Sequence, residues 1–303
     1  MWSHRTRQAR DVRRPLPLPP ELGGDPFTVA TAAAAGVGRQ RLRAADLSAP
    51  FHGVRTPIPP TTPLELARAY AARMPEKQFF SHVTAAQLWN IPMPRILEQR
   101  RELDVSVVAP DHPPQAKGVI GHRLTRVTVV ERRGLRVTDP AQTWAQLAAT
   151  LSVTDLVVAG DHLVRRKRPA STMEGLRAVA NRKILRKALK AIRPRTDSPQ
   201  ETRLRLLLVV GGLPEPVVGH SVTTAAGFVA TPDLAYVEAK VAVEYLGSDH
   251  WTDPRVFADD IQRREALQAA GWRVIEVIAA DLGRPAQLIA RVGRAIAAGT
   301  IDG

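Results

Sequence analysis

Two apolar stretches, residues 228–237 and 241–245, constrain the fold of this chain more than any other feature of its sequence. Both alternate with a period close to two, and the short segment 238–240 separates them. This pattern is typical of two antiparallel strands joined by a turn. On the second strand Glu244 and Leu246 are expected on one face and the valines on the other. The sequence therefore predicts a β-hairpin.

The hairpin carries two carboxylates where strands disfavour them. Asp233, just after Pro232, can face Glu244 across the strand pair, and a polar loop that contains His250 follows. A bare carboxylate in a buried strand costs free energy unless a cation or a donor satisfies it. Mg²⁺ prefers oxygen ligands, usually one or two carboxylates with phosphate oxygens. Asp233 and Glu244 are therefore candidate metal ligands, although Asp233 can instead be a turn residue and Glu244 can instead pair with an arginine.

Five ordered blocks of this region resemble the very-short-patch-repair-like (Vsr-like) endonuclease domain of the PD-(D/E)XK nuclease superfamily. The blocks are SPQETRLRLLL (198–208), PDLAY (232–236), VEYLGSDH (243–250), DDIQRREAL (259–267) and GWRVIEV (271–277). The resemblance implies a restriction-endonuclease-like mixed sheet flanked by helices. It also implies hydrolysis of DNA phosphodiester bonds that depends on Mg²⁺ or Mn²⁺.

The resemblance further implies roles for individual residues. The implied catalytic residues are Glu201, Asp233, Glu244 and His250, with the metal held by Asp233 and Glu244 and with His250 as a base or a group that orients water. Asp260 and Arg263 on the following helix are second-rank candidates, and Arg263 matches the arginine of the family. The helical spacing of these two residues also fits an ordinary ion pair within the helix.

Glu201 has a second, purely structural interpretation. Ser198 at the N-cap, Pro199 at the first helical position and Glu201 at the third form a capping-box pattern. The Glu201 carboxylate is therefore expected either at the metal site or on the amide of the N-cap residue.

The sequence departs from the family pattern at Leu246. Read as (D/E)-X-K, the motif is Glu244-Tyr245-Leu246, so leucine stands where lysine is usual and where close relatives carry an acid. Leucine can neither ligate a metal nor orient a water molecule. The departure bears on catalysis and leaves the expected fold unchanged.

The net charge of the chain is +14, which favours a polyanionic partner such as DNA. Residues 165–195 contain twelve Lys and Arg against one acid, whereas residues 233–281 contain ten acids and five bases. A helix is expected over residues 172–192, with apolar side chains on one side and the bases on the other. The bases expected to contact phosphates are Arg182, Lys183, Arg186, Lys187 and Lys190. The same bases can instead form a solvated helix face.

A small DNA-binding module is expected near the N-terminus. Thr28 can cap a helix that ends near Ala35, Gly36 makes a turn, and a second helix is expected over residues 39–47, before the extended segment 51–55. The segment resembles the winged-helix module that opens AbiEi-type antitoxins. The candidate DNA contacts at the start of the second helix are Arg39, Arg41 and Arg43. Alternatively, the segment is a small packing module with solvated arginines.

The expected fold class is a multi-domain mixture of α+β and α/β. The expected regions are a disordered basic tail (1–18), a winged-helix module (19–57), a middle α+β region (58–165), a basic linker helix (166–197) and a Vsr-like nuclease domain (198–303). The middle region contains His82, His122, Asp161 and His162, but their spacing does not match that of metal ligands. No metal site is expected there.

The sequence also limits the compartment of the protein. It contains no cysteine, no apolar stretch of the roughly 18 residues that a membrane span needs, and no apolar signal core behind its basic N-terminus. A soluble cytoplasmic protein without a membrane partner is expected.

The leading hypothesis is a Mg²⁺-dependent DNA endonuclease, and the alternative is an inactive nuclease fold that binds DNA as a regulator or antitoxin-like protein. A ribosomal or RNA-binding role ranks third.

Overall fold

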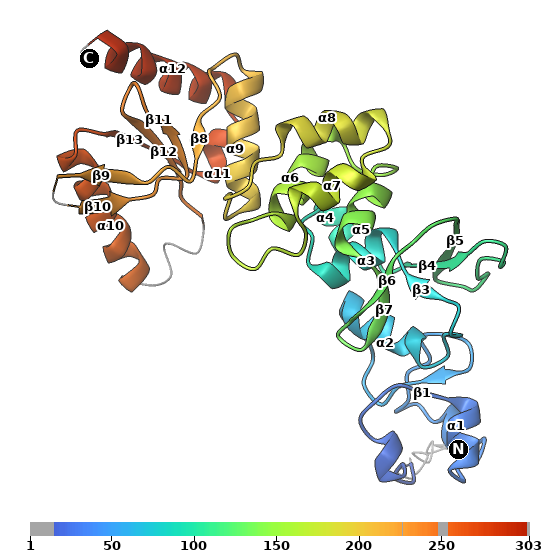
Figure 1. Ribbon diagram of the computed structural model, residues 1–303. Helices are drawn as coiled ribbons and strands as arrows, with labels where there is room; N and C mark the ends of the chain where they lie inside the picture. The colour runs from blue at the N-terminus through green and yellow to red at the C-terminus, as the bar shows by residue number, and fades with distance from the viewer. Residues whose placement is uncertain (1–14, 226, 248–253, 302–303) are drawn as a thin grey trace, which may run out of the picture. The chain divides into compact units, whose positions relative to one another are not determined.

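The computed structural model describes residues 15–225, 227–247 and 254–301, apart from the side chains of residues 254–260 and 301 (Figure 1). The chain divides into two compact units. The N-terminal unit comprises the described parts of residues 1–80 together with 100–137, and the C-terminal unit comprises 81–99 together with the described parts of 138–303. Helices and mixed sheets occur in the chain, so the expected mixed α and β class is confirmed. The region expected over residues 58–165 contributes to both units.

The N-terminal unit contains a five-stranded mixed sheet of order β5-β4-β3-β7-β6. Its strands are β3 (Phe79–Phe80), β4 (Leu103–Val108), β5 (Val119–Leu124), β6 (Val129–Arg132) and β7 (Leu135–Thr138). Strand β4 is parallel to β5 and antiparallel to β3. The unit also contains α2 (Pro63–Ala71), which Thr62 and Glu65 begin with a capping box.

The first part of this unit confirms one predicted helix and contradicts the other. Helix α1 (Val29–Ala34) begins at Thr28, whose hydroxyl accepts a hydrogen bond from the Thr31 amide. A short antiparallel pair, β1 (Phe27–Thr28) and β2 (Val54–Arg55), closes the segment. The helix predicted over residues 39–47 is wrong, because only the 3₁₀ turn η2 (Arg41–Arg43) forms there. A second 3₁₀ turn, η1 (Pro20–Leu22), precedes β1.

The missing helix has a local cause. Gly36, at φ +78°, and Gly38 precede the segment and raise the entropic cost of ordering it. Gln40, at the N-cap position of η2, makes no capping hydrogen bond. The Arg41 guanidinium instead forms a bidentate pair with Asp46, at 2.9 and 2.8 Å, which closes a turn. Arg41 is therefore engaged within the fold.

The first part of the C-terminal unit is a cluster of helices. They are α3 (His82–Trp89), α4 (Arg95–Glu98), α5 (Pro140–Leu147), α6 (Val153–Leu163), α7 (Met173–Val179) and α8 (Lys183–Ala191). Their core surrounds the buried Trp144, whose indole nitrogen donates to the Leu156 carbonyl at 2.8 Å. None of the helices in the described ranges is long and apolar enough to cross a membrane.

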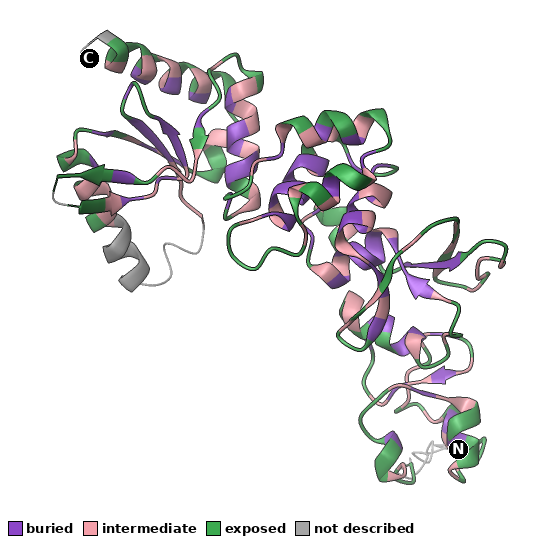
Figure 2. Ribbon diagram, viewed as in Figure 1, coloured by how far each residue is buried: buried purple, intermediate pink, exposed green. Residues whose placement is uncertain are grey.

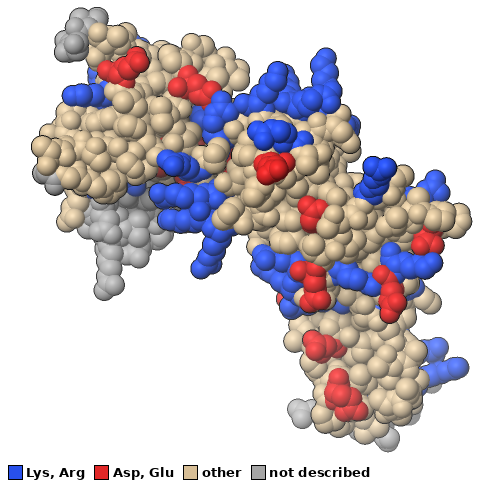
Figure 3. All heavy atoms as spheres, viewed as in Figure 1, with Lys and Arg blue, Asp and Glu red and all other residues tan. Residues whose placement is uncertain are grey.

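The single helix predicted over residues 172–192 is wrong, because two helices, α7 and α8, occupy this segment. Ala180 leaves the helical conformation with ψ 56°. The main-chain carbonyl of Asn181 then accepts a hydrogen bond from Arg186 Nη1 at 2.6 Å. Asparagine disfavours helix interiors because its side chain competes for backbone groups. The predicted amphipathic pattern is nevertheless present, since Leu185 and Ala188 are buried while the five bases of α8 and its N-cap are exposed. Figure 3 shows lysine and arginine side chains gathered along α8.

The rest of the C-terminal unit is built on a four-stranded mixed sheet of order β13-β12-β11-β8. Its strands are β8 (Val217–Val218), β11 (Leu234–Tyr236), β12 (Val241–Tyr245) and β13 (Arg273–Val277). A separate antiparallel pair consists of β9 (Val222–Thr224) and β10 (Gly227–Ala230). The helices of this part are α9 (Pro199–Val210), α10 (Pro254–Ala269), α11 (Ala279–Leu282) and α12 (Pro285–Ile301).

The predicted hairpin is confirmed for β11 and β12, which pair antiparallel with Leu234 opposite Val243. The first apolar stretch is not one strand, however. It divides into β10 and β11 at residues 231–233, where Pro232 has no amide to give to a sheet ladder. Residues 237–240 form the turn, with Lys240 at φ 48°.

The two faces of the sheet bury different side chains, and Figure 2 shows much of β11 and β12 coloured as buried. On one face Val241 and Val243 pack with Leu204 of α9 and with Val292 of α12. On the other face Ala235 and Ala242 pack with Leu267 of α10 and with the buried Trp272. The alternation of the two strands therefore places α9 and α10 on opposite faces.

A buried ion pair connects the helical cluster to α9. The Arg205 and Asp161 side chains are each 1% exposed and lie 2.9 Å apart, from Nη2 to Oδ2. Asp161 also accepts hydrogen bonds from the Thr202 hydroxyl at 2.8 Å and from the Arg193 amide at 2.7 Å. These donors offset part of the desolvation cost of the carboxylate, although burial still raises the pKa of Asp161. The pair therefore fixes the position of α9.

We predict that Arg205→Met lowers the free energy of unfolding by about 3–5 kcal/mol, because Asp161 remains buried without its cation. Denaturation in urea measures the change. Arg203→Met on the same helix is the matched control, since Arg203 is 35% exposed and pairs with Asp155 at 3.0 Å. It should cost about 1 kcal/mol or less. Equal small losses in the two variants contradict the anchoring role of Arg205.

Candidate functional site

The pairing of β11 with β12 brings Asp233 opposite Glu244. The register that places Leu234 opposite Val243 makes these two acids the next pair along the ladder. The Tyr245 amide donates to Asp233 Oδ2 at 2.8 Å, which holds the aspartate against the end of β12. The predicted approach of the two carboxylates is therefore present in the structure.

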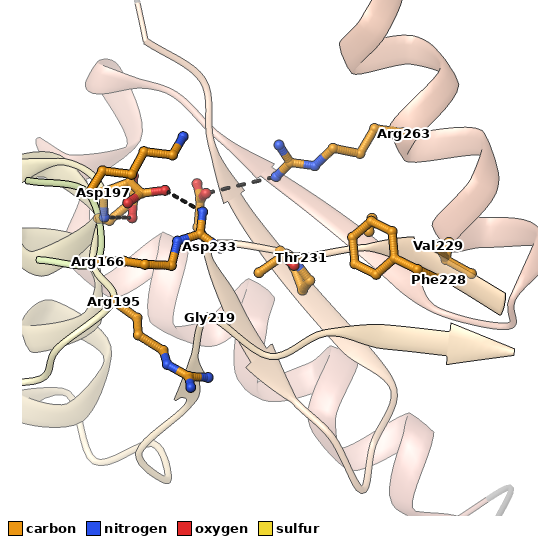
Figure 4. A pocket seen from close by; sticks show the side chains of 13 residues that line it. Arg166, Arg195, Asp197, Gly219, Phe228, Val229, Thr231, Asp233 and Arg263 are labelled. Carbon is orange, nitrogen blue, oxygen red and sulfur yellow. Dashed lines mark hydrogen bonds and ion pairs between the residues drawn. The ribbon is translucent and has the colours of Figure 1, made fainter.

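Arg263 of α10 reaches both carboxylates. Its Nη2 atom donates to Glu244 Oε2 and lies 3.9 Å from Asp233 Oδ1. Figure 4 shows Asp233 and Arg263 pointing toward each other. The next residue, Arg264, pairs instead with Glu276 of β13 at 2.8 Å. Of the two interpretations left open for Glu244, the arginine partner is therefore present, and Arg263 belongs to this cluster.

Glu201 serves the helix start and also lies near Asp233. The Ser198 hydroxyl accepts a hydrogen bond from the Glu201 amide at 3.2 Å, as a capping residue does. The Glu201 carboxylate accepts from the Asp197 amide at 2.9 Å, one residue before the expected N-cap amide. Glu201 is only 8% exposed, and burial raises its pKa against the effect of the Asp197 hydrogen bond.

The three carboxylates interact electrostatically. The pKa of Asp233 lies well above its usual range, first because of burial and then because of the negative charges of Glu201 and Glu244. The Tyr245 amide and the Arg263 guanidinium act in the opposite direction. A carboxyl group with a strongly raised pKa beside like charges is typical of functional sites, although structural networks produce it too.

Glu201, Asp233 and Arg263 line a cavity of about 450 Å³. Three bases line the same cavity: Arg166 and Lys167 from the segment between α6 and α7, and Arg195 from the segment between α8 and α9. Figure 4 shows Arg166 beside Asp197, with which it forms an exposed pair at 3.3 Å. The cavity therefore combines carboxylates with cationic side chains that can hold an anion.

The backbone holds Arg195 in an uncommon conformation. Its φ is +79°, in the left-handed region that non-glycine residues rarely adopt, and residue 219 beside it is a glycine at φ +64°. A Cβ atom on Gly219 would lie 3.0 Å from Arg195 Cβ. The absence of a side chain at Gly219 thus allows the Arg195 segment to approach the cavity. Strained backbone of this kind clusters at functional sites.

The donor set fits a hard divalent cation in its chemistry. Asp233 and Glu244 offer carboxylate oxygens, and Mg²⁺ is commonly held by one or two carboxylates with phosphate oxygens and water. A cation would also relieve the repulsion that raises the pKa of Asp233. Within residues 15–225, 227–247 and 261–300, no group of three or more His, Asp or Glu side chains is arranged to hold a metal ion by itself. The fit therefore rests on two carboxylates completed by a substrate.

The other predicted site residues fall into three groups. His250 and the Asp260 side chain lie outside the described parts of the chain. Arg39 and Arg43 are exposed residues of the N-terminal unit. The bases Arg182, Lys183, Arg186, Lys187 and Lys190 are exposed on α8 and at its N-cap, and none of them lines the cavity.

The histidines and the aspartate of the middle region have separate structural partners. The His82 ring contacts the Ser81 hydroxyl at 2.9 Å, and His122 Nε2 lies 2.7 Å from Asp104. The pKa of His162 is lowered to about 4 by burial and by Arg165. Asp161 belongs to the buried pair with Arg205.

Sequence reasoning missed the residues that complete the cavity: Arg166, Lys167, Arg195, Asp197 and Phe228. Arg166, Lys167 and Arg195 were counted in the basic segment, but no local pattern indicated that loops bring them beside Asp233. Phe228 was predicted as part of a strand. Its exposure in the structure is the signal that separates it from the core.

We predict that Asp233→Asn changes how stability depends on pH in the absence of divalent cations. Because the folded state raises the pKa of Asp233, it binds the proton more tightly than the unfolded chain does. The free energy of unfolding of the wild type should therefore fall as pH rises from about 4 through the raised pKa. The asparagine variant should lack this decline and be the more stable protein above that pKa.

Urea denaturation at several pH values in EDTA measures this effect. Glu238→Gln, at an exposed acid in the turn of the hairpin, is the control and should follow the wild type. An equal or steeper fall of stability with rising pH in Asp233→Asn than in the wild type would contradict the placement of Asp233 among like charges.

No protein-family model matches the chain, and no solved structure matches it. Two uncharacterised proteins from two strains of Mycobacterium tuberculosis are each 28% identical to it over 182 residues, which is 58% of this chain. The chain spans 65% of the length of each of these relatives.

Proposed function

We propose that this chain is a DNA endonuclease of the Vsr-like PD-(D/E)XK type that uses Mg²⁺ or Mn²⁺. The observation that supports the proposal most is the convergence of Glu201 and Glu244 on Asp233, where Glu201 and Asp233 line a cavity that basic side chains also line. Carboxylates concentrate a divalent cation, and the bases attract the phosphates of the substrate. This combination suits hydrolysis of a phosphodiester bond.

The proposed fold of residues 198–303 is restriction-endonuclease-like. A mixed sheet with α9 and α12 on one face and α10 on the other supports it. The proposed winged-helix character of the N-terminal segment has weaker support, because η2 replaces the expected second helix. DNA contacts by that segment would then rest on the exposed Arg39 and Arg43.

Asp233 and Glu244 are the residues that would hold the metal ion. When bound, the ion would polarise the scissile phosphate and neutralise the charge that develops on it. Arg166, Lys167 and Arg195 would bind neighbouring phosphates and orient the strand. These contacts give affinity without sequence choice, because phosphates carry no base information.

Two groups are candidates for moving the proton of the attacking water. His250 keeps this role as implied by the family resemblance. Glu201 is the second candidate, because its raised pKa and its place on the cavity wall suit a general base. Its hydrogen bond from the Asp197 amide fixes the direction of its carboxylate.

A second candidate function is DNA binding without cleavage, as a regulator or antitoxin-like protein. Two observations favour it. Leu246 replaces the usual lysine, and Arg263 already contacts both proposed metal ligands. In this alternative the guanidinium is the permanent partner of the two carboxylates, and no divalent cation binds.

Cleavage of supercoiled plasmid DNA distinguishes the two functions. We predict nicking that requires Mg²⁺ or Mn²⁺ and that falls at least about a hundredfold in Asp233→Ala, since loss of a charge-stabilising group costs several kcal/mol in the transition state. Glu238→Ala, which removes an acid outside the cavity, should keep the wild-type rate.

The Leu246→Lys and Leu246→Asp variants extend this assay. Restoring a polar group at the family position should raise the rate if residue 246 reaches the site. Absence of metal-dependent nicking in the wild type and in both Leu246 variants, with DNA binding retained, would support the binding function and overturn the endonuclease.

A further inference from the structure

Phe228 is an exposed aromatic side chain on the wall of the cavity. It belongs to β10, is 68% exposed and lines the same cavity as Asp233 and Arg263. Figure 4 shows its ring at the other end of the cavity from Arg195, with Thr231 between Phe228 and Asp233. The end of the cavity at Phe228 is therefore aromatic, whereas the end at Arg195 is cationic.

The hairpin does not need Phe228 for its own packing. The next two residues, Val229 and Ala230, pack into the core beside Ala235 and Trp272, and Ala230 is 3% exposed. The pairing of β10 with β9 shifts register between Phe228 and Ala230, and this bulge interrupts the strand alternation, so the Phe228 side chain is exposed although Ala230, two residues further on, is buried. Phe228 is therefore free of the core and can offer its ring to a ligand in the cavity that Asp233 also lines.

The cationic wall has room for phosphates. Arg166 pairs with Asp197 at 3.3 Å, and both side chains are about half exposed, so a phosphate can replace this weak pair. Arg195 and Lys167 are exposed and line the same wall. The positive φ of Arg195 is maintained at this place although the left-handed region disfavours arginine.

We propose that the cavity binds a single-stranded segment of DNA, with one base stacked on Phe228 and the adjoining phosphates on Arg166, Lys167 and Arg195. In a duplex both faces of each base are covered by neighbouring bases, so an aromatic wall can stack only on a base that has left the duplex or was never in one. Stacking on aromatic side chains is largely independent of base identity. That the ligand is DNA rests on the proposed function. The inference adds that the cavity binds DNA in its single-stranded form.

Binding in EDTA tests the proposal without any cleavage. The probes are a fluorescently labelled single-stranded oligonucleotide and the blunt duplex of the same sequence, and fluorescence anisotropy gives the two dissociation constants. Phe228→Ala should weaken single-strand binding by about fivefold to a hundredfold and change duplex binding by about twofold or less. Phe228→Trp should keep the affinity, and Phe228→Leu, which is apolar but has no ring, should lose it.

Two further variants separate stacking from general effects. Val210→Ala, at the 87% exposed last residue of α9, is the control for loss of an exposed apolar side chain and should leave both dissociation constants unchanged. Arg195→Gly suits the positive φ and removes a phosphate contact. This variant should lower the affinity for both the single strand and the duplex, and it should reduce the salt dependence of binding.

The proposal is overturned if Phe228→Ala leaves single-strand binding unchanged, or if it weakens the single strand and the duplex equally. These outcomes are independent of the nuclease activity. A protein that never nicks plasmid but binds single strands through Phe228 retains this inference and loses the endonuclease. A protein that nicks plasmid but whose single-strand binding does not depend on Phe228 retains the endonuclease and loses this inference.

Discussion

Mutual repulsion among Glu201, Asp233 and Glu244 is the constraint on which the C-terminal site depends. Burial raises the pKa of Asp233 most, the negative charges of Glu201 and Glu244 raise it further, and Arg263 offsets part of the cost by contacting Asp233 and Glu244. Such an arrangement persists only if the surrounding structure holds the groups in place. The antiparallel register of β11 and β12 does this for Asp233 and Glu244, and the start of α9 does it for Glu201.

The position of Glu201 depends in turn on a polar contact in the helical cluster. Thr202 and Arg205 follow Glu201 within about one helical turn, and both side chains bond to the buried Asp161 of α6. The helix that presents Glu201 is therefore anchored directly beside that residue. The helical cluster contributes Arg166, Lys167 and Arg195 as well, from the loops that follow α6 and α8. It thus supplies structure and charge to the site, although its sequence carries no recognisable chemical motif.

Much of the local structure could be predicted from the sequence, because it depends on local chemistry. The alternation in residues 241–245 predicts β12 and the facing of Asp233 and Glu244, and the Ser198 cap predicts the start of α9. The failures occurred where neighbouring residues compete. Asn181 divides a helix that periodicity joined, Pro232 divides a strand, and the glycines before Arg39 prevent the second N-terminal helix. The cavity wall could not be predicted because Arg195 and Phe228 reach it through loops and a hairpin far apart in sequence.

Metal binding tests most directly whether the carboxylate cluster is a cation site or an ion pair with Arg263. Titration of the protein with Mn²⁺ measures cation binding without DNA, because the electron paramagnetic resonance signal of free Mn²⁺ decreases as the ion binds. We predict that the protein binds Mn²⁺ and that its affinity increases with pH as Asp233 loses its proton. The affinity should fall at least about tenfold in Glu244→Gln. Equal binding in the wild type and Glu244→Gln, or no binding at millimolar Mn²⁺, would contradict the cation site and leave Arg263 as the partner of both acids.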